Sequence, residues 1–256
     1  MKRVFAVAAH PDDIEFFMSG TLMRLAAVGY ELHYMNLADG CCGSTQHDAE
    51  TIAAMRLEEA QNAAARIDAV FHGPLVHDLE IFYDRETLAR LAAIVRQVAP
   101  EIMLIHAPAD YMEDHMNACR LAVTAAFARG APNFPVEPPT PAVNKPVTLY
   151  HAQPYGNRDP LDEPVRPSTF VDVSELQDRK CDMLAEHKSQ RDWLDESQGV
   201  GSYLVKLREL DREVGQMSGR FEYAEGWRRH NHLGFCGPDD DPLVAALGEC
   251  VFCGDF

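Results

Sequence analysis

One imidazole and two carboxylates lie within four residues of one another near the start of the chain, in Ala9-His10-Pro11-Asp12-Asp13. The apolar run over residues 3–9 predicts a buried strand, because it is bounded by a proline and is too short for a helix. Carboxylates are costly to bury together unless a cation neutralises them. The segment therefore favours a metal site at the end of a strand, the alternative being a solvated turn that begins the next helix.

A second group of ionisable residues follows a later apolar run, 102–106. It consists of His106 and the segment Asp110-Tyr111-Met112-Glu113-Asp114-His115. Loops at the carboxyl ends of parallel strands converge at one edge of a sheet, which is where α/β proteins bind ligands. His10, Asp13 and His115 would there make a site of two histidines and one carboxylate. Such a site leaves positions open for water and suits catalytic Zn²⁺, although it also fits Fe²⁺.

Asp12 and Asp13 are adjacent, so it is hard for both to chelate one ion. The spare carboxylate would lie beside the water that the metal activates. Zinc lowers the pKa of its water toward ~7, and a neighbouring carboxylate can take up a proton and return it to a leaving amine. These residues together favour amide hydrolysis.

The elements that would position these residues alternate along the first half of the chain. Short apolar runs predict strands at 31–38, 69–72, 102–106 and 147–151, and helical periodicity predicts helices at 16–28, 49–67, 85–98 and 116–129. Residues 132–146 contain six prolines and predict a loop, followed by helices at 175–195 and 201–214. Strands separated by helices indicate an α/β fold with a mostly parallel sheet and helices on both faces.

Composition restricts the function further. At 256 residues we expect one domain, with a core over about 1–190 and a C-terminal extension over about 197–256. The net charge of −17 would repel a phosphate backbone, so we expect no nucleic-acid partner. With no export signal or apolar span evident, we expect a cytoplasmic protein without a membrane partner.

Seven cysteines are scattered along the chain, and we expect them to be reduced thiols. Cys250 and Cys253 have the spacing of a metal or redox pair. No second such pair accompanies them, so two ordinary thiols are the preferred interpretation.

The sequence Ala-His-Pro-Asp-Asp after an N-terminal strand, with a later Asp-x-x-x-Asp-His opening a helix, resembles the PIG-L-type (LmbE-like) de-N-acetylases. Further matches extend the resemblance over residues 1 to about 190: Arg56 in Arg-x-x-Glu, Asp78, Lys180, and His187-Lys188-Ser189-Gln190. The resemblance implies a Rossmann-like zinc enzyme that removes acetyl groups from N-acetylglucosaminyl compounds, as mycothiol- and bacillithiol-pathway deacetylases do. It also implies a small-molecule substrate and a homo-oligomer.

Carried over by position, the resemblance assigns zinc binding to His10, Asp13 and His115, and general acid/base catalysis to Asp12. Asp114 would orient a ligand. Arg56 would hold a substrate hydroxyl, the alternative being a surface ion pair with Glu58 or Glu59. The match at Asp78 is weaker, because Leu79 stands where the family usually has glycine.

Met112 is the main departure, because the family usually has a histidine there to stabilise an oxyanion or protonate the leaving group. Either zinc alone polarises the carbonyl, or another donor enters the site, and His230, His232 and Tyr111 are the candidates. We expect the remaining histidines and the two tryptophans to have packing or surface roles, with His106 and His187 next to the site or at an interface. They are His33, His47, His72, His77, His151, Trp193 and Trp227.

The sequence thus favours a zinc-dependent hydrolase that removes an acetyl or other acyl group from a small amino-sugar-like amide. An amidase for a larger sugar- or thiol-conjugate is the alternative within the same class. A metal-containing binding protein that has lost catalysis is the alternative from another class. Asp12 argues against the binding protein, since such a site has no use for a base beside open coordination positions.

Overall fold

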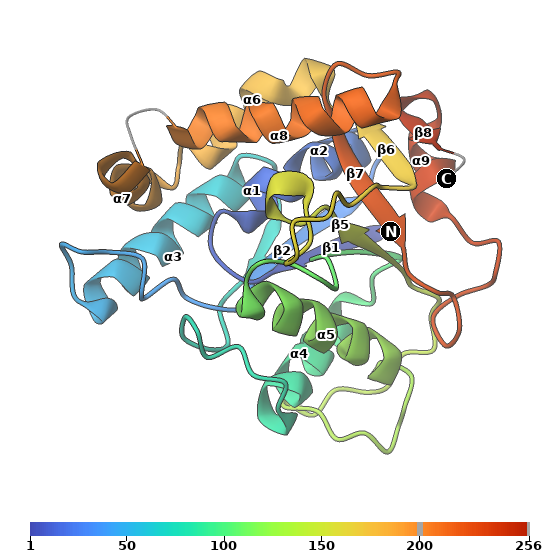
Figure 1. Ribbon diagram of the computed structural model, residues 1–256. Helices are drawn as coiled ribbons and strands as arrows, with labels where there is room; N and C mark the ends of the chain where they lie inside the picture. Colours follow the sequence, from blue (N-terminus) through green and yellow to red (C-terminus); the bar gives the residue numbers. More distant parts are fainter. Residues whose placement is uncertain (199–201, 255–256) are drawn as a thin grey trace.

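The computed structural model describes residues 1–198 and 202–254, and of residues 192, 195–198 and 202 only the backbone (Figure 1). Within these ranges eight strands form one sheet in the order β3-β2-β1-β4-β5-β7-β6-β8. The predicted α/β fold with a mostly parallel sheet is confirmed.

The first five strands are parallel to one another. β1 (Arg3–Ala8) lies between β2 (Glu31–Asn36) and β4 (Ile102–Ile105). β3 (Val70–His72) extends the sheet beyond β2, and β5 (Thr148–Ala152) extends it beyond β4. This arrangement places the loops that follow β1 and β4 next to each other at one edge of the sheet.

Three antiparallel strands complete the sheet, and the sequence patterns did not predict them. β7 (Ala224–Arg229) pairs with β5 and with β6 (Thr169–Asp172), and β8 (Val251–Cys253) pairs with β6. Residues beyond 197 therefore contribute two strands to the same sheet. β6 and β8 are short, and Glu225, buried in β7, interrupts the apolar pattern that indicates a strand.

Helices cover both faces of the sheet (Figure 1). Along β1, Phe5 and Val7 point to one face and Val4, Ala6 and Ala8 to the other, as the two-residue period of a strand requires. The first face packs on α4 (Arg85–Val98) and α5 (Glu113–Ala128). The opposite layer contains α1 (Asp13–Phe17), α2 (Ser19–Ala27), α3 (Ala49–Ala65), α6 (Gln177–Leu184) and α8 (Ser202–Ser218).

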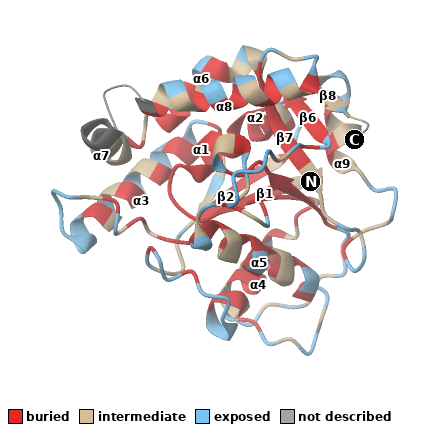
Figure 2. Ribbon diagram, in the orientation of Figure 1, coloured by how far each residue is buried: buried red, intermediate tan, exposed pale blue. Residues whose placement is uncertain are grey.

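Two further helices lie at the margins of the second layer: α7 (Lys188–Gln198) contacts α3 and α8, and α9 (Pro242–Leu247) contacts α2. Single 3₁₀ turns occur at Tyr155–Asn157, Ser174–Leu176 and Gly248–Cys250. The central strands between the layers are buried (Figure 2).

Two predicted helices are divided in the structure. The helix expected over 16–28 is α1 and α2, separated at Met18. The helix expected over 175–195 is a 3₁₀ turn, α6 and α7, with residues 185–187 outside the helices. The helix expected over 201–214 is found as α8, although residue 201 lies outside the described residues.

A buried lysine connects the antiparallel strands to the helical layer. The Lys180 ammonium lies 2.7 Å from Asp211 Oδ2 and 2.6 Å from Glu225 Oε1, and its side chain is fully buried. Glu225 also accepts hydrogen bonds from the backbone N–H groups of Gly20 and Thr21, at the start of α2. One cation thus stabilises two buried carboxylates that connect α2, α6, α8 and β7.

Replacing Lys180 with methionine is expected to lower the free energy of unfolding by about 3–5 kcal/mol, because two buried carboxylates lose their counter-ion. Chemical denaturation measures this change. Arg208→Ala is the matched control, since the Arg208–Asp178 ion pair is exposed and should contribute little. Equal effects of the two substitutions would contradict the structural role given to Lys180.

Candidate metal centre

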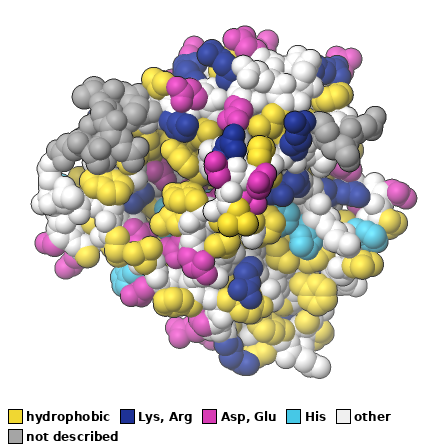
Figure 3. All heavy atoms as spheres, viewed as in Figure 1, with side chains coloured by type: hydrophobic (Ala, Val, Ile, Leu, Met, Phe, Trp, Pro, Cys, Tyr) yellow, Lys and Arg dark blue, Asp and Glu magenta, His cyan; other side chains and the backbone are white. Residues whose placement is uncertain are grey.

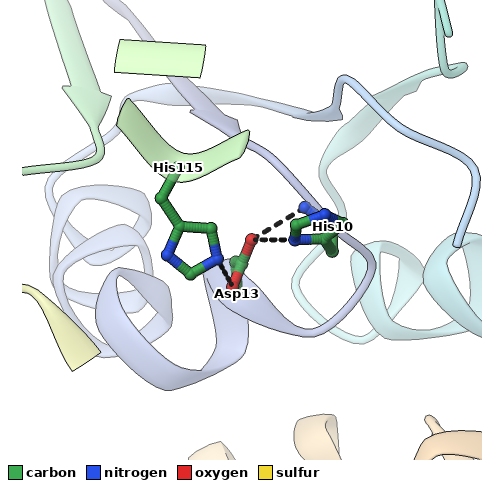
Figure 4. A group of neighbouring side chains, drawn as sticks. All are labelled: His10, Asp13 and His115. Carbon is green, nitrogen blue, oxygen red and sulfur yellow. Dashed lines mark hydrogen bonds and ion pairs between the residues drawn. The ribbon is translucent and has the colours of Figure 1, made fainter. Parts of the chain in front are cut away.

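The three predicted metal ligands meet at the carboxyl edge of the parallel strands. His10 and Asp13 follow β1, and His115 lies in the first turn of α5, which follows β4. One ligand atom from each side chain lies within 4.8 Å of the other two, and all three residues are buried. Figure 4 shows the two imidazoles pointing toward the Asp13 carboxylate.

Asp13 is the centre of this cluster. Its Oδ1 lies 3.3 Å from His115 Nε2, and its Oδ2 lies 3.5 Å from His10 Nδ1. Oδ2 also accepts the backbone N–H of His10 at 2.7 Å, which closes the turn between the two residues. Burial by itself would raise the pKa of Asp13, but His115 and His106 hold it well below its usual range.

A second carboxylate contacts the far nitrogen of each imidazole. His10 Nε2 lies 3.1 Å from Asp114 Oδ2, and His115 Nδ1 lies 3.1 Å from Asp110 Oδ1. Burial opposes protonation of both rings, but these carboxylates and Asp13 raise the pKa of His10 to about 9 and of His115 to about 10. A carboxylate on the far nitrogen is the arrangement that orients histidine ligands on a metal, so the donor set fits a divalent cation.

Asp12 is buried beside this cluster without being part of it. Its backbone has φ +107°, a region that L residues seldom adopt and that recurs at functional sites. Tyr203 Oη donates a hydrogen bond to Asp12 Oδ2 at 2.7 Å, and the Arg56 guanidinium lies 3.9 Å from Oδ1. Burial raises the pKa of Asp12 to about 6, against the opposing effect of Arg56.

His106 lies directly behind His115. The two rings stack at a centroid distance of 4.2 Å, and His106 Nε2 accepts the N–H of Ala9 at 3.0 Å. Burial lowers the pKa of His106, and its neighbour His115 lowers it further. Neutral His106 therefore packs against the ring of His115. It lies next to the site, which is one of the two positions expected for it.

Arg56 is buried, so the alternative of a surface ion pair is wrong. Its guanidinium donates to Pro11 O at 2.7 Å and to Gly40 O at 3.3 Å. Glu59 instead accepts hydrogen bonds from Ser189 N and Oγ, which connects α3 to α7.

The candidate ligands, together with Asp12 and Arg56, line a cavity of about 760 Å³, a size typical of small-molecule sites. Its wall combines the ionisable cluster with Arg56, Asp78, Gln190, Lys206 and Glu209, and with an aromatic group. The aromatic residues are Phe16, Phe17, Tyr111, Tyr155, Trp193 and Tyr203. Asp78, the weaker match, is thus in the cavity wall, where it accepts the N–H groups of Gly40 and Cys42.

The three candidates for replacing the histidine missing at position 112 differ in whether they line the cavity. Met112 lines the cavity, and so does Tyr111, whose ring lies 5.6 Å from that of His115. His230 and His232 do not line it. His230 instead bonds His151, at 2.8 Å between Nδ1 and Nε2. The suggestion that His230 or His232 enters the site is therefore wrong.

The packing role expected of Trp227 is confirmed. Trp227 is fully buried, and its indole N–H donates to Thr21 Oγ1. The cysteines are free thiols, and among the described residues no metal-ligand cluster includes Cys250 or Cys253. In the face shown in Figure 3, acidic and basic side chains are mixed with hydrophobic ones. No helix within the described ranges is both long and apolar enough to cross a membrane.

The fold and the site define a Rossmann-like α/β protein with a buried His/Asp metal-site candidate at the carboxyl edge of its sheet. Comparison with known families adds that residues 5–127 match the family described as PIG-L, GlcNAc-PI de-N-acetylase. Residues 5–127 of the chain are thus similar to the PIG-L family.

The proteins to which the chain is similar include deacetylases and a hydratase. Diacetylchitobiose deacetylase of Thermococcus kodakarensis is 28% identical over 239 residues, which cover 89% of this chain and 83% of the relative. 4-Oxalmesaconate hydratase of Pseudomonas putida is 29% identical over 187 residues, 70% of each chain. The structure of N,N'-diacetylchitobiose deacetylase from Pyrococcus horikoshii shares the fold, with a TM-score of 0.75 and 24% identity over 95% of this chain and 89% of that chain.

Proposed function

We propose that this chain is a metal-dependent hydrolase that removes an acetyl group from the amide nitrogen of a small amino-sugar-like substrate. The observation that carries the proposal is the position of Asp12, a buried carboxylate next to the cluster of His10, Asp13 and His115 and in the wall of the same cavity. The family match and the deacetylase relative support an amide as the substrate.

His10, Asp13 and His115 would hold the metal, with Asp114 and Asp110 fixing the two imidazoles. A divalent ion such as Zn²⁺, or alternatively Fe²⁺, supplies a Lewis acid for the amide carbonyl and the attacking water when it is bound. Among the described residues no sulfur atom belongs to this ligand cluster.

Asp12 would move the proton. It accepts a proton from the attacking water as the new carbon–oxygen bond forms, and passes it to the amide nitrogen as the carbon–nitrogen bond breaks. Acetate and a free amine are the products. Tyr203 and Arg56 hold the Asp12 carboxylate in place, and Arg56 also fixes the preceding carbonyl of Pro11.

Arg56 is also proposed to contact a substrate hydroxyl, since it lines the cavity. The aromatic residues of the wall suit the apolar face of a sugar ring, and its polar residues suit hydroxyl groups.

Tyr203→Phe is expected to lower kcat by ~10-fold with little change in KM, because it removes one hydrogen bond to a charged group. The phenylalanine ring keeps the packing against Phe16, 5.2 Å between centroids. Steady-state kinetics with metal content measured in parallel test this expectation. An unchanged kcat, or a loss explained by lost metal, would show that Tyr203 does not position Asp12.

Hydration of a carbon–carbon double bond is the second candidate. The hydratase relative favours it, and so does Met112, because a thioether cannot donate a hydrogen bond to a developing oxyanion. A metal next to a base could serve either a water-adding enzyme or an amide hydrolase. The two candidates differ in their products.

A screen of N-acetylated sugars and amides with zinc-loaded protein, scored for released acetate, tests the proposal. Metal-free protein is the control. We expect acetate release from at least one N-acetylated amino sugar in the presence of the metal. Loss of ultraviolet absorbance from conjugated unsaturated acids, without acetate release from any amide, would show that the enzyme is a hydratase and not a deacetylase.

A further inference from the structure

A second group of metal-ligand side chains lies outside the catalytic cluster. Donor atoms of Asp39, Cys41 and His77 all lie within 4.8 Å of one another. Asp39 and Cys41 belong to the loop after β2, and His77 follows β3, the neighbouring parallel strand. His77 was expected to have a packing or surface role, and its Nδ1 lies 2.5 Å from Asp39 Oδ2.

Hydrogen bonds from two carboxylates, Asp39 and Asp78, fix the backbone of the loop that contains Asp39 and Cys41. Asp39 Oδ1 accepts the N–H of Cys41 at 3.0 Å, which fixes carboxylate and thiol on one turn. Asp78, next to His77, accepts the N–H groups of Gly40 at 3.1 Å and of Cys42 at 3.0 Å. The two loops are therefore already joined, so an ion need not order them when it binds.

The donor types select the metal. A thiolate, an imidazole and a carboxylate are all ligands of Zn²⁺, whereas Mg²⁺ and Ca²⁺ prefer oxygen alone. We propose that Asp39, Cys41 and His77 form a second metal site, selective for Zn²⁺ and similar transition ions. Three protein ligands leave a fourth tetrahedral position for water or for a ligand from another molecule.

An ion has a path to this site. The side chain of His77 is 69% exposed, and with Asp39 it lines a separate cavity of about 450 Å³. Carboxylates of Glu80, Asp84 and Glu86 line the same cavity together with Arg90, and their excess negative charge attracts cations toward the cluster. Bound metal would add a second connection between two loops that contribute Cys42 and Asp78 to the catalytic cavity.

Titration of the reduced, metal-free protein with Co²⁺ tests the proposal, because thiolate coordination to cobalt gives a charge-transfer absorption band. Among the described residues the catalytic cluster has no sulfur ligand, so the band reports a thiolate site outside that cluster. We expect the wild-type protein to bind two cobalt ions per chain and to show the band. Cys41→Ser should lose the band and one ion. His77→Ala should weaken the cobalt binding that the band reports by ~10-fold or more.

Matched variants show which cysteine gives rise to the absorption band. Cys42→Ser changes the adjacent thiol, whose Sγ lies 3.9 Å from that of Cys41, and should keep the band, as should a Cys250→Ser/Cys253→Ser double variant. His115→Ala should lose one ion and keep the band. A wild-type protein without the band, a band that survives in Cys41→Ser, or a band lost with Cys42 would overturn the proposal. If Cys41→Ser does not fold, the proposal is tested by comparing His77→Ala with His47→Ala. Only His77→Ala should weaken the cobalt binding that the band reports.

Discussion

Replacement of His115 with alanine is expected to abolish both metal binding at the catalytic cluster and turnover. His115 supplies one of three ligand atoms, and Asp13 and His10 cannot close the site without it. Loss of a residue that only supports a ligand typically weakens metal affinity 10–100-fold. Loss of the ligand itself should therefore exceed ~100-fold, measured by competition with a chelator.

His47→Ala is the matched control, because His47 is an exposed histidine in the loop before α3. It should bind metal and release acetate as the wild-type protein does. Removing metal from the wild-type protein with a chelator should reproduce the activity loss of His115→Ala, and adding Zn²⁺ back should restore it. Full turnover in metal-free protein would contradict the proposed role of the cluster.

Asp12→Asn is expected to retain the catalytic metal and to lose kcat by ~100-fold or more, the usual contribution of a general acid/base. Asparagine keeps the shape of the side chain and can still accept the hydrogen bond from Tyr203. It also tolerates the positive φ of this position better than most residues, so the turn should persist. The change therefore removes the ability to take up a proton and little else.

Asp13→Asn provides the reciprocal comparison, since the two carboxylates are adjacent in the chain. Asp13→Asn should weaken metal binding, whereas Asp12→Asn should not, and both should lose activity. Metal content and single-turnover kinetics on the two variants separate the roles. A kcat of Asp12→Asn within ~10-fold of the wild type would show that another group moves the proton.

Local signals predicted most of the parallel half of the fold. Helix α4 is found over the predicted residues because Asp84 caps its first turn and Pro100 follows its end. The division of the helix predicted over 175–195 has no comparable signal. There His187 is buried against Glu15 of α1, 3.4 Å away, and that contact depends on tertiary packing.

The site could be predicted from topology because its ligands follow two strands, β1 and β4, that are neighbours in a parallel sheet. The sequence placed Asp110 in the same cluster as His115 but gave it no role, because its contact with the imidazole appears only in the fold. Tyr203 was missed altogether. It reaches Asp12 from a helix 191 residues away in the chain, and nothing in its surrounding sequence marks it.

A crystal structure of the zinc-loaded protein, with anomalous scattering recorded at the zinc absorption edge, tests the proposed catalytic centre most directly. We predict an anomalous peak bonded to His10, Asp13 and His115, with the Asp12 carboxylate facing the open coordination position. A peak that excludes His115, or one that includes Asp12 as a ligand in place of Asp13, would contradict the assignment of the metal and of the base.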